Sequence, residues 1–341
     1  MRKIIAVFVS LILLTGCSGV PAYQVNERAY VQIFGVSKTG DNFSVYIQLI
    51  ADGETDVISG VGRTVNDAIA DAELSEGKKL FLGHMKLFIL GDGLRDISKE
   101  LEVFLSGDIC PACPVAYAEN PGEIAALGKD EDGYTADELL KVITVYAEQG
   151  KSIITPLTAV AVGTAEGYTA APVPIISAAG GKLEVGGVTF AAKDGIVGFL
   201  AQEDVFGLHC LLGKPQKGGK VTVVSQFDEG NLTAATDILG AKIKKTVTVK
   251  NGAAELDIKI TLKTDVTENP FGIPDEKIEE ATRRYVSNAV SRAFTAAVWD
   301  SGKDTVGVAK LLRKTDNAAY EAFIENPAAG IEEVTLRVTV G

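Results

Sequence analysis

The feature that most constrains this chain is its opening segment, in which two basic residues are followed by an apolar run. Arg2 and Lys3 precede Ile4–Leu14, a run that only Ser10 interrupts. A run of about eleven residues is too short for a membrane-spanning helix, which needs roughly twenty. A charged start, a short apolar middle and a small-residue exit are the layout of a secretory signal peptide. The residues that follow are therefore expected to fold outside the cytoplasm.

The exit from this segment is more specific than an ordinary cleavage site. Leu14–Cys17 reads Leu-Thr-Gly-Cys, which is similar to the lipobox at which bacterial lipoproteins are cleaved and lipidated. The sequence therefore predicts a lipoprotein signal peptide over 1–16 and a first mature residue, Cys17, that is an N-palmitoyl and S-diacylglycerol cysteine. Each buried methylene contributes about 0.8 kcal/mol, so several acyl chains give a durable anchor. The alternatives are an ordinary signal peptide with a coincidental cysteine, or a short uncleaved membrane anchor.

The charge balance excludes one class of partner. The chain has 45 acidic and 33 basic residues and a net charge of −12, and loss of Arg2 and Lys3 makes the mature chain more acidic. Nucleic-acid binding depends on clustered Lys and Arg, so no nucleic acid is expected as a partner. Nor does this overall charge attract the chain to anionic lipid. The acyl chains are therefore expected to hold it at the extracytoplasmic face of the cell membrane.

Three cysteines remain besides Cys17. Cys110–Cys113 reads Cys-Pro-Ala-Cys, the two-residue spacing of redox motifs and of half a zinc site. A zinc site would need a second spaced ligand pair, whereas His209 and Cys210 are adjacent. A redox role would place the pair at a helix start, whereas the prolines indicate a loop. We expect a structural or incidental role for Cys110 and Cys113, with a local disulfide, catalysis or metal binding as alternatives.

Other candidate catalytic residues are few. His84 lies at the start of the buried strand expected over Met85–Leu90, where a satisfied core or structural histidine is expected. In a strand, His209 and Cys210 would point to opposite faces and could not form a nucleophile–base pair. The Gly-Gly pairs lack the spacing of a phosphate-binding loop. The sequence thus predicts no catalytic residue, no cofactor and no metal site.

Alternation of apolar and polar residues predicts strands, and capping residues predict helices. The expected strands are Ala29–Val36, Phe43–Ile50, Met85–Leu90, Leu183–Ala191, Ile196–Leu200, Val221–Phe227, Ile243–Lys250, Ala254–Thr264 and the closing run Val334–Val340. The expected helices begin at Thr64, after Gly93, at Asn120 and at Thr135, and occupy Asp275–Trp299, Val306–Leu312 and Ala318–Ile324. Thr155–Gly163 and Val173–Ser177 are apolar, β-branched runs, and Pro174 interrupts the second.

These elements predict an α+β lipoprotein of three domains, with mixed or antiparallel sheets flanked by helices. After the signal peptide, residues 17–107 are expected to form an N-terminal α+β domain and residues 108–179 a middle α+β domain. Residues 180–341 are expected to form an antiparallel sheet covered by one long helix.

Five stretches in a fixed order add a resemblance to a known family. They are Glu27–Ala29 with Ile33–Val36, Lys79–Leu87, Gly187–Phe190 with Lys193–Leu200, Glu203–Leu208, and the final helix region ending in Val334–Gly341. Together with the lipobox, they resemble the Ger(x)C spore germination proteins, the lipoprotein C subunits of bacterial germinant receptors. The resemblance implies a non-catalytic, lipid-anchored subunit that is required for spore germination. It also implies assembly with integral-membrane A and B subunits in the spore inner membrane.

Two other functions compete with this interpretation. The first is a lipid-anchored extracytoplasmic solute-binding protein, a class that usually alternates strands and helices in two lobes. Residues 180–341 instead group their strands before their helices, which disfavours it. The second is an exported thiol oxidoreductase built around Cys110 and Cys113.

Overall fold

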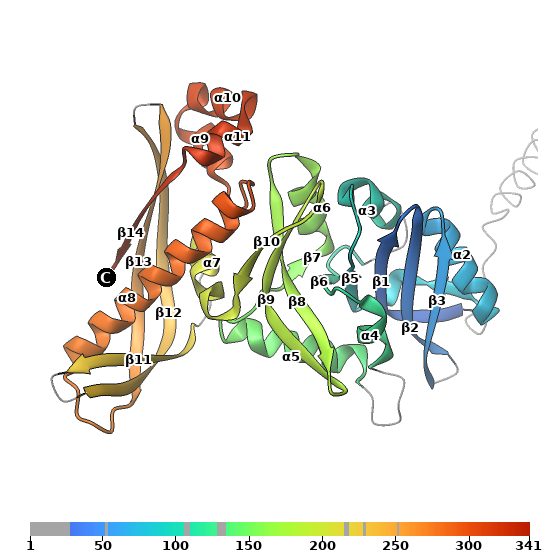
Figure 1. Cartoon of the computed structure of the whole chain (residues 1–341), viewed down its shortest axis with the longest axis horizontal. Coiled ribbons are helices and arrows are strands. Elements are labelled where there is room, and N and C mark those ends of the chain that lie inside the picture. The colour runs from blue at the N-terminus through green and yellow to red at the C-terminus, as the bar shows by residue number, and fades with distance from the viewer. Residues whose placement is uncertain are drawn as a thin grey trace, which may run out of the picture.

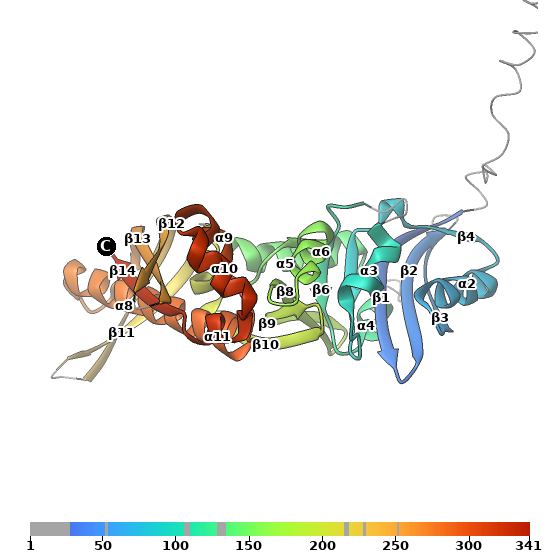
Figure 2. The ribbon, with the colours of Figure 1, turned by 90° about the horizontal axis from the view of Figure 1, so that it is seen from above.

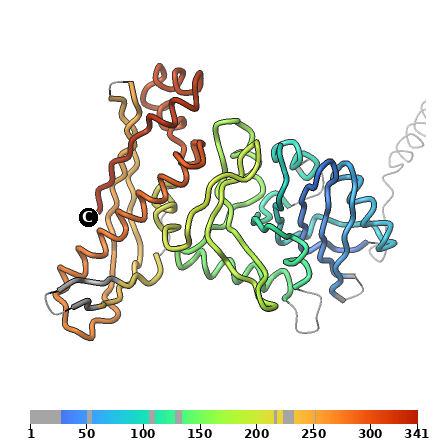
Figure 3. The backbone as a smooth tube through the Cα atoms, viewed as in Figure 1, coloured from blue at the N-terminus to red at the C-terminus, as the bar shows by residue number. Residues whose placement is uncertain are grey.

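The computed structural model describes residues 28–51, 54–105, 110–127, 134–214, 218–227, 230–250 and 252–341. The chain advances from one end of an elongated molecule to the other (Figure 3). The N-terminal half builds a large mixed sheet, and the C-terminal residues build a small sheet crossed by a long helix (Figure 1). The predicted α+β class is confirmed. Cys17 and the predicted signal peptide lie outside the described residues.

The large sheet has the strand order β10-β9-β8-β6-β5-β1-β2-β3, with β4 pairing with β1 and β7 with β6. Its strands, in the described part of the chain, are β1 (Arg28–Thr39), β2 (Asn42–Ala51), β3 (Glu54–Gly62), β4 (Lys79–Phe81), β5 (Leu87–Leu90), β6 (Pro114–Tyr117), β7 (Thr155–Pro156), β8 (Ala170–Ala179), β9 (Lys182–Ala192) and β10 (Gly195–Ala201). The contacts of β5 with β1 and β6, and of β6 with β8, are parallel, whereas the β1–β2 hairpin is antiparallel as predicted.

Helices cover both faces of this sheet. They are α2 (Val65–Glu76), the turn η2 (Leu82–His84), α3 (Ile97–Leu105), α4 (Pro121–Ala126), α5 (Ala136–Glu148) and α6 (Leu157–Ala165). Successive strand residues point to opposite faces. Phe34 therefore shares a core cluster with residues of α2, α3 and α6, while Ile33 shares another with residues of α4 and α5. The first half of the chain is thus a three-layer unit.

Local capping explains where two of these helices begin. Thr64 and Asp67 form a reciprocal capping box at the start of α2, and Thr135 and Glu138 form another at the start of α5. Each box satisfies backbone N–H groups that a helix start otherwise leaves without partners. Both helix starts were predicted, and Pro121 opens α4 as predicted.

Two features of this half differ from the elements that the sequence predicts. The β-branched run that includes Leu157 is helical, because Leu157, Val160 and Thr164 recur on one buried face of α6. Strand β3 was not predicted. It contains Gly60, where a Cβ would lie 2.1 Å from the carbonyl oxygen of Ala68, so glycine lets α2 approach the strand closely while weakening the strand signal.

The small sheet has the order β11-β12-β13-β14. Its strands within the described residues are β11 (Gly219–Phe227), β12 (Gly230–Lys250), β13 (Ala253–Glu268) and β14 (Thr335–Val340). An antiparallel sheet was expected, and β11, β12 and β13 pair in that way. The last strand, β14, is instead parallel to β13, because helices carry the chain back before it enters the sheet.

The remaining helices lie beside the small sheet or at its junction with the large sheet (Figure 2). They are η3 (Gln202–Asp204), α7 (Val205–Leu211), α8 (Asp275–Phe294), the π-helical turn η4 (Thr295–Asp300), α9 (Val308–Thr315), α10 (Asn317–Glu325) and α11 (Pro327–Glu332). The long helix predicted from Asp275 exists, and Ile278, Val286 and Ala293 on its predicted apolar stripe are buried. Its core continues into β9 and β10, since Val188, Phe190 and Leu200 belong to the same cluster.

The three-domain division stays a prediction. Strand pairing crosses both proposed boundaries, since β5 pairs with β6 and β8 with β9. In the described part of the chain, no helix has the length and apolar character needed to cross a bilayer.

Candidate functional site

The predicted site residues do not converge. Within the described residues, no group of three or more His, Cys, Asp and Glu side chains is placed to hold a metal ion. Cys110, Cys113 and Cys210 are free thiols. The structural roles of the His and Cys residues therefore have to be considered one at a time.

The Cys-Pro-Ala-Cys segment forms a turn that supports α6. The backbone N–H of Cys113 donates to the carbonyl of Cys110 at 3.0 Å. The N–H groups of Leu157 and Thr158, at the start of α6, donate to the carbonyls of Cys113 and Pro111 at 2.8 and 3.2 Å. Burial raises the pKa of the Cys113 thiol to about 12, which is the opposite of an activated redox cysteine. The turn therefore positions a helix.

The sequence predicted that His84 lies at the start of a buried strand, and this prediction is wrong. His84 ends the η2 turn and is exposed, because β5 begins only at Leu87. Its ring lies edge-on to that of Tyr30 at a centroid distance of 5.7 Å and tilted against that of Phe81 at 5.4 Å. These contacts belong to a small aromatic cluster on the surface.

His209 and Cys210 lie in a helix, whereas a strand had been considered. Every residue of α7 is buried, so the apolar run has no exposed face from which helical periodicity could be read. His209 Nε2 lies 2.8 Å from the carbonyl oxygen of Ser152. Burial lowers the pKa of His209 and raises that of Cys210 to about 12. Both groups are therefore uncharged parts of the core at neutral pH.

The helix α7 forms the junction between the two sheets, and its fit against α8 depends on Gly207. A Cβ at Gly207 would lie 2.2 Å from the carbonyl oxygen of Ala289 and 2.6 Å from the backbone nitrogen of Val290. Only glycine permits this approach of two backbones. Glu203–Leu208, one of the stretches that carried the family resemblance, is therefore the segment that connects the two halves of the chain.

An ion pair spans the same crossing. Arg292 of α8 donates from Nε to both carboxylate oxygens of Asp204, at 2.9 and 2.8 Å, and from Nη2 at 2.6 Å. Asp204 is buried, whereas the Arg292 side chain is about half exposed. The side-chain hydrogen bond to Asp204 raises the pKa of Arg292. A bidentate contact fixes direction as well as distance, so it sets the angle between η3 and α8.

A second polar group links the junction to the small sheet. Lys245 of β12 donates to the carbonyl of Leu211 at 2.8 Å and to that of Val306. Burial lowers the pKa of Lys245 to about 8. Asp304 accepts the N–H groups of Val308 and Ala309 at 2.7 and 2.8 Å, and burial raises its pKa. These groups complete the backbone hydrogen bonding of α7 and α9.

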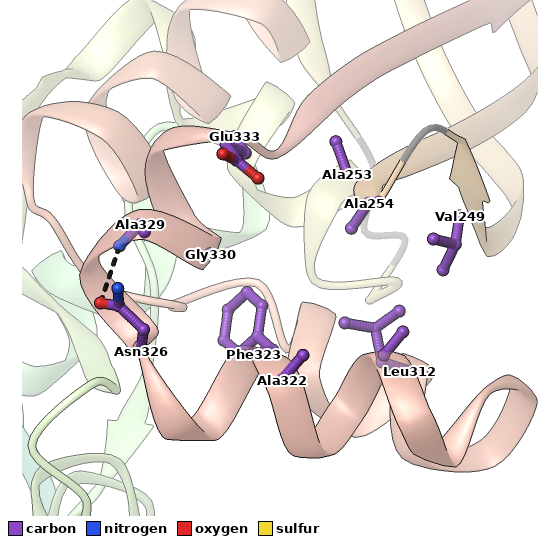
Figure 4. A pocket seen from close by; sticks show the side chains of 12 residues that line it. Val249, Ala253, Ala254, Leu312, Ala322, Phe323, Asn326, Ala329, Gly330 and Glu333 are labelled. Carbon is purple, nitrogen blue, oxygen red and sulfur yellow. Dashed lines mark hydrogen bonds between the residues drawn. The ribbon is translucent and has the colours of Figure 1, made fainter.

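One pocket opens between the β12–β13 turn and α9–α11 (Figure 4). Its volume is about 140 Å³, and Val249, Leu312 and Phe323 contribute its larger apolar side chains. The Asn326 side chain accepts the N–H of Ala329 at 3.4 Å, so it helps to begin α11. Glu333 is exposed. The pocket therefore offers a small apolar hollow without a buried charged group that could orient a substrate.

Comparisons with known proteins agree with this architecture. Residues 22–178 match the model of the spore germination protein N-terminal domain, and residues 186–340 match that of the spore germination B3/GerAC-like C-terminal domain. Residues 1–18 match the prokaryotic membrane lipoprotein lipid attachment site. No curated protein matches the chain. A solved structure, described as the crystal structure of the GerBC protein, shares the fold with a TM-score of 0.61 and 15% sequence identity. The aligned region covers 90% of this chain and 95% of that one.

The fold and these matches define an α+β spore germination protein that begins with a lipoprotein lipid attachment motif. More particularly, the chain belongs to the Ger(x)C family of spore germination proteins. The resemblance seen in the sequence is confirmed. The Asp204–Arg292 pair was not predicted from the sequence, and no local signal marks it, because the two residues are 88 positions apart.

Proposed function

We propose that this protein is the non-catalytic, lipid-anchored subunit of a nutrient germinant receptor and is required for spore germination. The observation that carries the proposal is the consecutive match of both spore germination domains, which together span 22–178 and 186–340. The likeness to the GerBC protein supports the fold alone.

The anchor is proposed to be lipid on Cys17, at the extracytoplasmic face of the spore inner membrane. Support comes from the lipid attachment model matched over residues 1–18. The first described strand, β1, starts at Arg28, and ten residues of sequence separate it from Cys17. Ten extended residues reach at most roughly 35 Å. The folded body is thus kept close to the membrane.

The proposed partners are the integral-membrane A and B subunits of the receptor. A short tether raises the effective concentration of the folded body beside proteins in the same membrane, so a modest interface is sufficient for assembly. Loops and exposed sheet edges are the proposed contact regions, because they carry backbone groups that the core does not use.

A non-catalytic role is proposed for the whole chain. It is supported by the described residues: Cys110 and Cys113 lie in a turn away from both histidines, and His209 and Cys210 are neighbours in α7 that are both buried and uncharged. The pKa values of Cys113 and Cys210, raised to about 12, also argue against a thiol oxidoreductase.

Co-purification from spores tests the assembly. An affinity tag after Gly341 would follow β14, whose end is exposed. Inner membranes are solubilised in mild detergent, and the captured proteins are identified by mass spectrometry. The A and B subunits should be recovered with the wild-type chain and should be much reduced with the Cys17→Ala variant. Capture of the folded wild-type chain without either integral-membrane subunit would contradict the proposal.

A further inference from the structure

The small sheet has one buried and one exposed face, and the exposed face carries a group of lysines. In β13, the residues Leu256, Ile258 and Ile260 point into the core beneath α8. The alternate residues point away from it. We call the side chains of Lys242, Lys244, Lys259 and Lys263 the lysine face, and all four are exposed.

These lysines are close neighbours. Lys244 and Lys259 are directly opposite each other in the strand register, Lys242 is opposite Thr261, and Lys263 is opposite Gly240. Like charges directly opposite each other destabilise a sheet. None of the four lysines forms an ion pair within the part of the chain that the structure describes. This arrangement stabilises neither strand, and it leaves four exposed positive charges available to an external anionic partner.

Acidic residues border the lysine face without covering it. At one end Glu255 and Asp257 are already paired, with Lys250 at 2.7 Å and with Arg337 at 2.7 Å. At the other end Asp265 is opposite Asp237. The four lysines therefore form a local basic area on a chain whose net charge is −12.

The composition of this face favours a headgroup surface over a protein surface. Protein interfaces have an apolar core rich in aromatic residues. Among the described side chains of β12, β13 and β14, the only large apolar one that is exposed is Leu239, in the bulge next to Gly240. Threonines, whose hydroxyls can donate to phosphate oxygens, lie between the lysines instead: Thr246, Thr261 and Thr339.

We propose that the lysine face docks onto anionic phospholipid headgroups as a second membrane contact, at the opposite end of the molecule from β1 (Figure 1). The choice of the membrane rests on the proposed lipid anchor, which would already hold the chain there. One lipid signal combined with a basic patch is a common way to attach a protein firmly.

The negative net charge of the whole chain does not prevent this docking. Charges are screened over about 8 Å at physiological ionic strength, so a surface responds to the charges nearest to it. The net charge alone predicts that anionic lipid would not attract this chain. The strand register instead gathers four lysines on one face, which the composition does not reveal.

Vesicle co-sedimentation tests the proposal with the mature chain, residues 17–341, carrying Cys17→Ser so that no acyl chain contributes. The probes are vesicles of phosphatidylcholine alone and vesicles that also contain phosphatidylglycerol. The test variant is K242Q/K244Q/K259Q/K263Q. The control variant, K151Q/K182Q/K310Q/K314Q, removes the same charge from exposed lysines elsewhere. Circular dichroism and thermal unfolding check that both variants are folded.

We expect the unmodified and control chains to sediment with the phosphatidylglycerol vesicles and not with phosphatidylcholine alone, and to be released by salt. Each lysine removed from the face should lower the partition coefficient roughly fivefold, and all four together by several hundredfold. Equal binding of the test and control variants would overturn the proposal. A second result would also overturn it: the unmodified chain binds no vesicles, and the test variant fails to recover the receptor subunits in the co-purification from spores. That result would identify an acidic protein as the partner of the lysine face. Failure of lipid attachment at Cys17 would leave this measurement unchanged.

Discussion

Gly207 of α7 lies so close to Ala289 of α8 that a Cβ on the glycine would be 2.2 Å from the alanine carbonyl oxygen. The two helices thus touch through their backbones, with no side chain between them. The pair Asp204–Arg292 holds the same crossing from its edge. Because α7 follows β10 and α8 covers the small sheet, this crossing determines how the two halves of the chain fit together.

We predict that Gly207→Ala destabilises the protein by about 3 kcal/mol, because the added methyl group meets backbone atoms that cannot rotate away. Denaturant unfolding followed by circular dichroism measures the change. Gly167→Ala is the matched control, since a Cβ there has no neighbour within 4 Å, and its effect should stay within about 0.5 kcal/mol. An equal effect of the two substitutions would show that the helices do not cross in this way.

We predict that His209 makes the protein sensitive to acid. Burial keeps its folded-state pKa below that of the unfolded chain, which is about 6.5. The unfolded state therefore binds the extra proton first, and stability that is present above about pH 6.5 falls by up to about 1.4 kcal/mol per pH unit as the pH drops toward the folded-state pKa. Unfolding midpoints measured between about pH 7 and pH 5 should show this loss reduced in His209→Gln and retained in His84→Gln. Identical profiles for the two variants would contradict the buried neutral histidine.

The parts of the fold that were predicted from sequence are those set by local chemistry. Thr64 and Thr135 predict the starts of their helices because each capping box is completed by a residue three positions later. The hairpin of β1 and β2 could be predicted because polar residues alternate in the sequence with apolar residues that are buried, such as Val45.

The parts that were missed depend on packing between distant segments. The helix α7 is buried on all sides, so its sequence has no amphipathic period. The β12 strand is far longer than the run Ile243–Lys250 predicted for it, and a bulge between Ile238 and Gly240 interrupts its alternation. The junction could not be predicted because Asp204 and Arg292 are 88 positions apart. The lysine face could not be predicted because it depends on the register of β12 and β13, which places Lys244 opposite Lys259.

We predict that two of the thiols are protected in the native protein. In a Cys17→Ser chain, an aromatic disulfide reagent at about pH 8 should modify Cys110 and leave Cys113 and Cys210 unmodified, because both are buried with pKa values raised to about 12. All three should react once the chain is unfolded. The Cys110→Ser variant should show almost no native reaction, and rapid native modification of that variant would contradict the burial of the remaining thiols.

We predict that Cys17 carries the lipid. Labelling of cells with a palmitate analogue should tag the wild-type chain, which should sediment with membranes. The Cys17→Ala variant should lose the label and either leave the membrane fraction or keep its signal peptide, whereas Cys110→Ser should behave as the wild type does. Persistence of the label in Cys17→Ala would place the lipid elsewhere.

The central claim is that this protein serves nutrient-triggered germination as a receptor subunit, and the most direct test is deletion of its gene in the spore-forming host. Germination is followed as the fall in optical density of purified spores after nutrients are added. The deletion spores should lose their response to one class of nutrient, regain it when the gene is restored, and germinate normally with a trigger that bypasses the nutrient receptors. Deletion spores that respond to every nutrient at the wild-type rate, in a host without a second gene of this family, would contradict the claim.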